Sequence, residues 1–323
     1  ANAVIGNNRL RNPKNLWSTR TAENRILALC CQSGDQEAGM VATMLRSIEH
    51  KKQLNDVALL YRTHFLSRPL EEALLHHGIP YRIIGGIRFY ERKEIKDLLA
   101  YLRLIINPYD KISLMRIINT PARGLGQKFE EQLLQASVQN PLFDFYQLLN
   151  FMREDKDLAL PPSKAESVTA LLKLFADLNP SLSPRFLLDT IIERTNYIGH
   201  LTQTYDMTEA QTKIENVQEF AQAVTVFEEK HAALGAAADP AQQSMLETFL
   251  HEVSLLQEKM TEDNAANCVQ LMTLHAAKGL EFDTVILTGL EEGLLPNTKA
   301  LNTNEELEEE RRLMYVGMTR AKE

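Results

Sequence analysis

The sequence comprises 323 residues, of which 44% are hydrophobic and 24% charged, and this length is enough for two domains with separate cores. Its net charge of −8 excludes a surface that is basic throughout, so any nucleic-acid site would have to be local. No apolar run approaches the roughly 20 residues that a membrane-spanning helix needs. The first residues do not resemble a secretion signal, and the absence of an initiator Met suggests a fragment of a longer chain.

The first part of the chain alternates between strand and helix patterns. Strands are expected at residues 25–30, 56–61 and 81–84, and helices at 36–50 and 66–77. Alternation of this kind favours a parallel sheet with right-handed crossovers. The sequence therefore predicts an α/β domain near the N-terminus.

A long helical region follows Gly86, and strand patterns return only near the C-terminus. Helices separated by Asn-Pro, Pro-Pro and similar breakers are expected at 91–106, 129–138, 163–178, 184–195, 208–230 and 241–260. Two further strands, 269–274 and 283–288, precede a helix over 305–316, whose acidic run within residues 305–310 is expected to form a solvated face. We therefore expect an α/β domain in two segments, residues 1–88 and 266–323, interrupted by an all-helical insert over residues 89–265.

The three cysteines are Cys30, Cys31 and Cys268, and no His or Cys partners accompany them at zinc-site spacing. They are expected to be reduced thiols in the core. No metal site is predicted from the residues of this chain.

The densest pattern lies at the C-terminus, in residues 269–282 and 309–321. Thr273 and His275 come directly after an expected strand, and the carboxyl edge of an open parallel sheet is where ligands bind. Gly279 and the small residues before it would let backbone amides approach a phosphate closely.

These two blocks resemble motifs V and VI of superfamily-one helicases of the UvrD/Rep/PcrA type. The resemblance implies a RecA-like domain of the P-loop NTPase fold, the second in its protein. It also implies that Thr273 and His275 contact a single DNA strand, and that Gly279 and Glu281 lie at the ATP site, with Glu281 near the ribose. Arg320 would reach the γ-phosphate as the catalytic arginine, a role that suits a planar, permanently charged guanidinium.

Residues 56–68 resemble motif IVa of the same family. By that resemblance Arg62 and Thr63 would meet DNA phosphates, and His64 occupies a position where the family usually has Asn. Residues 86–98 resemble the helix that opens the family's inserted subdomain, for which a hinge role is expected.

A compact turn over residues 119–127 stands out within the helical region. Gly124 and Gly126 flank Leu125 just before an expected helix, so backbone amides there could hold a phosphate without reading bases. The family carries a similar Gly-Ile-Gly turn that binds duplex DNA, which would place Arg123, Gly124 and Gly126 at a DNA contact.

Several family motifs are absent from the sequence. There is no Gly-Lys dipeptide and hence no P-loop, no Asp-Glu pair after an apolar strand, and no Gln-Asn-Tyr-Arg segment. The chain is therefore expected to be the C-terminal half of a bacterial cytoplasmic helicase, inactive alone. ATP with Mg²⁺ would be held mainly by a missing N-terminal RecA-like domain of the same chain. The expected partners are single-stranded DNA and single/double-strand junctions, with no membrane.

Other interpretations fit parts of the same pattern. Taken alone, a histidine at a strand end is usually a solvated loop residue, and an arginine after a helix usually interacts with the helix dipole. The chain could also be a non-catalytic DNA-binding or partner-docking module, part of a RecB-like helicase–nuclease, or an α/β protein without a nucleotide role.

Overall fold

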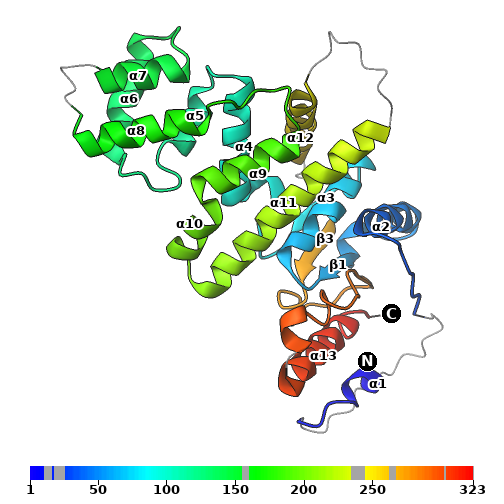
Figure 1. The fold of residues 1–323 in the computed structure, drawn as a ribbon. Helices are drawn as coiled ribbons and strands as arrows, with labels where there is room; N and C mark the ends of the chain where they lie inside the picture. Colours follow the sequence, from blue (N-terminus) through cyan, green and yellow to red (C-terminus); the bar gives the residue numbers. More distant parts are fainter. Residues whose placement is uncertain are drawn as a thin grey trace. The chain divides into compact units, whose positions relative to one another are not determined.

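The computed structural model describes residues 1–10, 17, 26–154, 160–233, 244–261, 267–301 and 303–322. The chain forms two compact units, one made of residues 1–89 with 256–323 and the other of residues 90–255 (Figure 1). The first unit contains the sheet, and the second is helical. The expected boundary between residues 265 and 266 lies outside the described residues.

The sheet of the first unit is parallel, as predicted. Its strands are β1 (Val57–Tyr61), β2 (Tyr81–Ile83), β3 (Val269–Thr273) and β4 (Thr284–Leu287), in the order β2-β3-β1-β4. The central strand β1 is buried along its whole length. It pairs with β3, which follows it by about two hundred residues, so the sheet forms only when both segments of the discontinuous unit are present.

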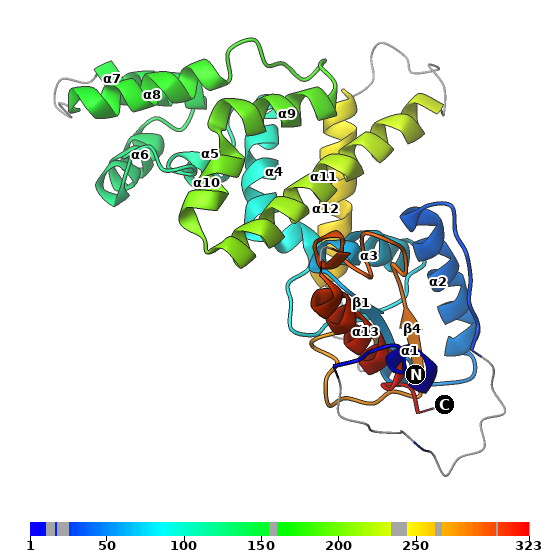
Figure 2. The same ribbon diagram turned by 60° about the horizontal axis from the view of Figure 1, so that its bottom comes forward.

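Helices α2 (Gly34–Glu49), α3 (Ser67–His76) and α13 (Asn304–Met318) complete this unit, with the short α1 (Asn2–Ile5) beside α13 (Figure 2). Ser33 and Thr303 begin α2 and α13 as N-caps, each accepting a hydrogen bond from the backbone three residues later. One face of the sheet buries a core with the second half of α13. The core is built from Ala58, Leu60, Met272, Leu274, Ala277, Phe282, Leu295 and Leu313.

The strand predicted at residues 25–30 is wrong where it can be tested. Arg25 lies outside the described residues, and residues 26–30 form no strand. Ile26 and Leu27 are 83% and 67% exposed. An apolar, β-branched segment becomes a strand only when a neighbouring strand satisfies its backbone groups, and no described strand does so here.

The expectation of three core thiols is correct for one of them. Cys268 is buried beside β3, whereas Cys30 is exposed and Cys31 is half-buried. Cys30 and Cys31, for which the expectation is wrong, belong to the segment that does not join the sheet.

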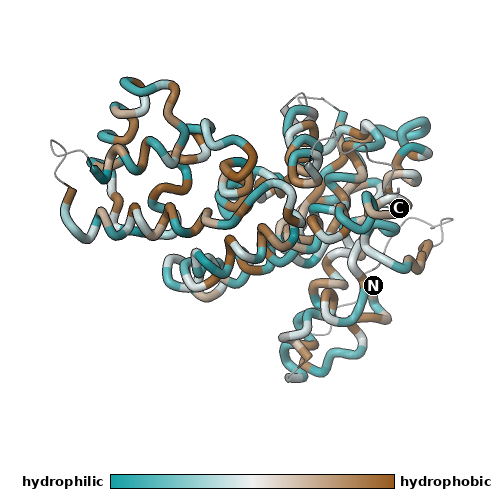
Figure 3. The backbone as a smooth tube through the Cα atoms, turned by 45° about the horizontal axis from the view of Figure 1, so that its top comes forward, coloured by the Kyte–Doolittle hydropathy of each residue, from teal (hydrophilic) through white to brown (hydrophobic). Residues whose placement is uncertain are grey.

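The helical unit contains α4 (Lys93–Ile106), α6 (Gln127–Gln139), α8 (Pro162–Leu174), α9 (Pro184–Thr195), α11 (Met207–Ala233) and most of α12 (Met245–Thr261), close to the predicted helices. Its shorter helices, α5 (Lys111–Ile117), α7 (Phe145–Glu154) and α10 (Tyr197–Thr204), were not predicted. Hydrophobic and hydrophilic stretches alternate along these helices (Figure 3). No helix in the described part of the chain is long and apolar enough to cross a membrane.

Candidate functional site

Four of the predicted DNA-contacting residues lie close together at the carboxyl edge of the sheet. They are Arg62, Thr63, Thr273 and His275. Thr273, the last residue of β3, pairs with Tyr61, the last residue of β1. The Leu274 amide donates to the Tyr61 carbonyl at 2.8 Å and extends the pairing by one residue. Because the two strands are parallel, Arg62 and Thr63 emerge next to Thr273 and His275 at the carboxyl edge. The structure thus brings together residues that are about 210 positions apart.

Arg62 is held by a buried carboxylate. Its Nε donates to both carboxylate oxygens of Glu310 at 3.0 and 3.1 Å, and its Nη2 donates to Oε1 at 2.9 Å. Glu310 is only 4% exposed and also accepts the Asn297 amide at 3.0 Å. Nη1 of Arg62 makes no hydrogen bond within the described residues. Glu310 therefore fixes the orientation of the guanidinium and leaves one nitrogen for another acceptor.

Two neighbouring hydroxyl groups differ in how they are satisfied. The Thr273 Oγ1 accepts the Ala276 amide at 3.3 Å and shapes the turn after β3. The Thr63 Oγ1 is buried and has no hydrogen-bond partner among the described residues. A buried hydroxyl without a partner is costly, so Thr63 is suited to a ligand that supplies one. The ring of His64 lies about 3.3 Å from where a Cβ on Gly86 would be.

His275 is exposed overall, yet part of its ring is buried and its pKa is lowered. Partial burial lowers its pKa below the ordinary 6.5, and the Arg62 guanidinium lowers it further, while Glu310 and Glu309 oppose these effects. A neutral imidazole can donate one hydrogen bond to a phosphate oxygen. The negative charge of a bound phosphate would in turn raise the pKa of His275 and favour its protonated form.

Arg320 lies with different residues. Its guanidinium donates to the carbonyls of Leu280 at 2.9 Å and Val316 at 3.0 Å, and to the Thr319 hydroxyl at 3.0 Å. The Phe282 amide donates to the Arg320 carbonyl at 2.9 Å, just before β4 begins. All three acceptors of the side chain are neutral, and no carboxylate among the described residues pairs with Arg320, in contrast to Arg62.

Gly279 and Glu281 flank the Leu280 carbonyl that Arg320 contacts, and both are exposed. Gly279 has a φ of +88°, a conformation that disfavours a side chain. The segment carrying them returns from the carboxyl end of β3 to the amino end of β4. The three residues expected at the nucleotide therefore gather at the amino end of β4, away from the carboxyl edge that carries Thr273 and His275.

The position of Arg320 depends on a glycine that the sequence patterns did not reveal. A Cβ on Gly317 would lie 2.6 Å from Leu274 Cδ2 and 2.9 Å from Leu287 Cδ2. The absence of a side chain lets the last turn of α13 approach the sheet closely and sets where Arg320 leaves the helix.

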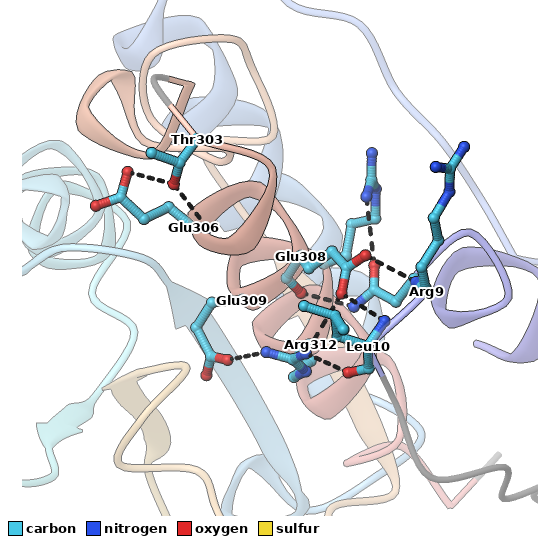
Figure 4. A network of polar contacts seen from close by, with 9 residues as sticks. Arg9, Leu10, Thr303, Glu306, Glu308, Glu309 and Arg312 are labelled. Atoms are coloured by element: carbon cyan, nitrogen blue, oxygen red, sulfur yellow. Dashed lines mark hydrogen bonds and ion pairs between the residues drawn. The ribbon is translucent and has the colours of Figure 1, made fainter.

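The expectation that residues 305–310 form a solvated helix face is wrong for two of its five glutamates. Glu310 holds Arg62, and Glu308 is 6% exposed. Glu308 accepts the backbone amides of Arg9 at 2.7 Å and Leu10 at 3.1 Å (Figure 4). These amides lower the pKa of the Glu308 carboxyl. Sequence spacing alone could not reveal partners about 300 residues away.

Arg312 completes this attachment of the first residues to α13. Its Nη2 donates to the Leu10 carbonyl at 2.7 Å and lies 3.5 Å from Glu308 (Figure 4). The Asn8 side chain, itself 5% exposed, donates to the Glu308 carbonyl at 2.8 Å. We call these contacts of residues 8–10 with Glu308 and Arg312 the Glu308 clip.

The turn over residues 119–127 exposes its backbone, whereas the guanidinium of Arg123 is bound by groups of the same unit. Nη1 of Arg123 donates to the carbonyls of Ile117 at 2.7 Å and Pro121 at 3.1 Å, and Nη2 donates to the Tyr101 hydroxyl. Gly124 has a φ of +70°, and neither it nor Gly126 has an atom within 4 Å of its Cβ position. Gly126 begins α6 without a side-chain cap. Arg123 shapes the turn, and open space surrounds its glycines.

No cluster of three or more His, Cys, Asp or Glu residues that could hold a metal ion occurs in the described part of the chain. The residues that gather around Arg320 fit one side of a triphosphate site, because they offer an uncompensated guanidinium beside an exposed glycine turn. They include no P-loop.

Comparison with known proteins agrees with these motifs. The chain is 38% identical to the ATP-dependent DNA helicase PcrA of Bacillus subtilis (strain 168) and covers 43% of it. It is 38% identical to the ATP-dependent DNA helicase UvrD1 of Mycobacterium tuberculosis (strain H37Rv), and 35% identical to PcrA of Staphylococcus aureus (strain NCTC 8325), with the same coverage of 43%. All of this chain is matched in each case, so it spans less than half the length of these relatives. A model of the UvrD-like helicase C-terminal domain matches residues 1–323, and the chain belongs to that family.

Proposed function

We propose that this chain is the C-terminal motor portion of an ATP-dependent DNA helicase that moves 3′ to 5′ along single-stranded DNA in the bacterial cytoplasm. The support is the match to DNA helicases over the whole chain, together with the two groups of motif residues at opposite strand ends. We propose domain boundaries at residues 1–88, 89–265 and 266–323. An N-terminal RecA-like domain outside this sequence would supply the P-loop, and the chain alone would not hydrolyse ATP.

Arg320 is proposed to be the arginine finger. ATP with Mg²⁺, bound mainly by the N-terminal domain, would supply the phosphoryl group that is transferred to water. The uncompensated charge of Arg320 supports a role in stabilising negative charge on that group. Release from the Leu280 and Val316 carbonyls would let its guanidinium reach across the cleft, while Glu281 would hydrogen-bond to the ribose and Gly279 would allow close approach of the backbone.

The carboxyl edge is proposed to hold the single strand. Nη1 of Arg62, the unpartnered hydroxyl of Thr63 and the imidazoles of His64 and His275 would donate to successive phosphates, with Thr273 beside them. These contacts carry no base specificity, which suits a protein that must move along any sequence. Cleft closure at Arg320 would shift this edge and advance the strand.

The turn over residues 119–127 is proposed to hold duplex DNA at a single/double-strand junction. Amides near Gly124 and Gly126, at the uncapped start of α6, would donate to a phosphate. We assign Arg123 to shaping this turn from beneath, because its guanidinium donates to carbonyls of the same segment.

The uncompensated charge of Arg320 is the observation on which this proposal depends most, and Arg320→Ala in the full-length protein tests it. We expect DNA-stimulated ATP hydrolysis to fall about 1,000-fold or more, as when other arginine fingers are removed, while ATP and single-strand binding persist. Arg153→Ala, which removes a surface arginine paired with Glu154, is the control and should leave the rate unchanged. A normal rate in Arg320→Ala would exclude Arg320 from the reaction.

A further inference from the structure

A pocket of about 340 Å³ opens beside the turn in the helical unit. Its walls come from Pro121 to Arg123, from Lys173 and Leu174 of α8, and from Arg194 near the end of α9. Three of its lining residues are cationic and, among the described residues that line it, none is acidic. This local positive charge contrasts with the net charge of −8 of the chain and favours an anionic ligand.

The two arginines of the pocket are fixed by neutral groups. Nη1 of Arg194 donates to the carbonyls of Leu174 at 2.7 Å and Ala176 at 2.9 Å. Arg123 donates to the carbonyls of its own turn. Neither guanidinium has a carboxylate partner among the described residues, so both charges are pre-oriented and uncompensated. Lys173 is exposed at the rim and has no described partner, so its ammonium is free to follow a ligand.

A hydrogen bond connects the helix that lines the pocket to the turn. The Ser167 hydroxyl of α8 donates to the Arg123 carbonyl at 2.8 Å. Lys173 therefore lies on a helix that is attached directly to the residue preceding Gly124. A polyanion that contacts the turn would meet the lysine without any rearrangement of the fold.

We propose that this pocket binds a backbone phosphate of double-stranded DNA, adjacent to the phosphate held by the turn. The inference rests on the proposed duplex contact at Gly124 and Gly126 and adds Lys173 and Arg194 to it. A repeating phosphate chain suits two neighbouring anion sites, one built from amides and one from cations.

The test uses the full-length protein with Lys173→Gln. We expect its affinity for a junction with a duplex arm to fall about fivefold, the effect of one exposed ionic contact of about 1 kcal/mol. The slope of log K against log salt should become shallower by about 0.9, the value for one phosphate contact. Affinity for a single strand of equal length should not change. Lys173→Arg keeps the charge and should retain duplex affinity.

Lys164→Gln is the matched control, since Lys164 lies on the same helix nine residues earlier and points about 180° away at 100° per residue. It should leave both affinities unchanged. Unaltered duplex affinity and salt slope in Lys173→Gln would overturn the pocket as a phosphate site, as would equal losses on duplex and single strand. If Lys173→Gln had no effect but Gly124→Val weakened duplex binding, the turn would remain a duplex contact and the pocket would not be one. If neither variant had an effect, both duplex contacts would be wrong.

Discussion

Arg62 and Arg320 show how the surroundings of the same side chain suit it to different tasks. Arg62 is bound by Glu310 on two of its nitrogens, so its charge is largely compensated and its orientation is fixed. A guanidinium with a largely compensated charge suits a DNA phosphate contact that must form and break at every translocation step. The Arg320 guanidinium donates to three neutral oxygens and has no carboxylate partner among the described residues, which suits the proposed contact with a triphosphate.

His275 gives a prediction about pH. Burial and Arg62 keep its pKa below 6.5 in the free protein, and a bound phosphate should raise it. Single-strand affinity should therefore increase as pH falls below about 6.5, because the bound state takes up a proton. The free energy of unfolding should instead decrease as pH falls, since His275 binds a proton more readily in the unfolded chain. NMR titration of the His275 ring with and without a DNA strand measures both pKa values.

The control for this titration is His275→Gln, which should remove most of the pH dependence of DNA binding. An unchanged pKa of His275 on addition of DNA would mean that no phosphate lies near the ring.

Gly317 gives a prediction about packing. A methyl group there would lie within 3 Å of Leu274 and Leu287, so Gly317→Ala should lower the free energy of unfolding by about 1–3 kcal/mol, a usual cost of overpacking. Urea denaturation measures the loss. Gly39→Ala in α2 is the matched control, because no atom lies within 4 Å of its Cβ position and alanine should stabilise that helix by up to about 1 kcal/mol. A Gly317→Ala variant as stable as Gly39→Ala would contradict the close approach of α13 to the sheet.

At the scale of elements, the Glu308 clip attaches the first ten residues to the helix that carries Glu310 and leads to Arg320. Glu308→Gln should speed amide hydrogen exchange at Arg9 and Leu10, because a neutral amide is a weaker acceptor than a carboxylate. Glu305→Gln, at an exposed position in the first turn of the same helix, is the control. Because these contacts lower the pKa of Glu308, the clip should be intact above the ordinary value of 4.5 and weaken as pH falls below it. Equal exchange in both variants would show that the clip does not restrain the segment.

The elements that the sequence predicted best are those whose burial does not depend on distant partners. Strand β1 is a run of apolar residues buried on both faces, and β3 is mostly apolar and buried apart from the half-buried Gln270, so their pattern alone identifies them. The segment over residues 26–30 has a similar composition but no described strand beside it, which no local pattern reveals. Helices α5 and α10 are seven and eight residues long, too short for a clear helical period.

In the candidate site, too, the features that depend only on local sequence were the predictable ones. The positions of Thr273, His275 and Arg320 at strand or helix ends could be predicted from local patterns, whereas their proposed roles come from the resemblance to the helicase family. The roles of Glu308 and Glu310 could not be predicted, since an acidic run at a helix start usually faces water. Their burial depends on Arg62 and on the backbone of residues 9–10, which only the fold brings to α13.

At the scale of the whole molecule, two of the proposed contact regions lie on one sheet and a third lies on the helical unit. The carboxyl edge of β1 and β3 carries the proposed strand contacts, and the amino end of β4 carries the proposed nucleotide contacts. The proposed motor function needs these two regions to respond to each other, and the hydrogen-bonded strands of the sheet connect them. The relatives that the chain matches are ATP-dependent DNA helicases more than twice its length.

The most direct measurement is a structure of the full-length protein with single-stranded DNA and a non-hydrolysable ATP analogue. We expect the Arg320 guanidinium to have left the Leu280 carbonyl and to lie within about 3 Å of a γ-phosphate oxygen. Arg62 and His275 should contact the strand in the same complex. If Arg320 still donated to Leu280 and Val316 while another residue bound the γ-phosphate, the proposed motor role of this chain would be contradicted.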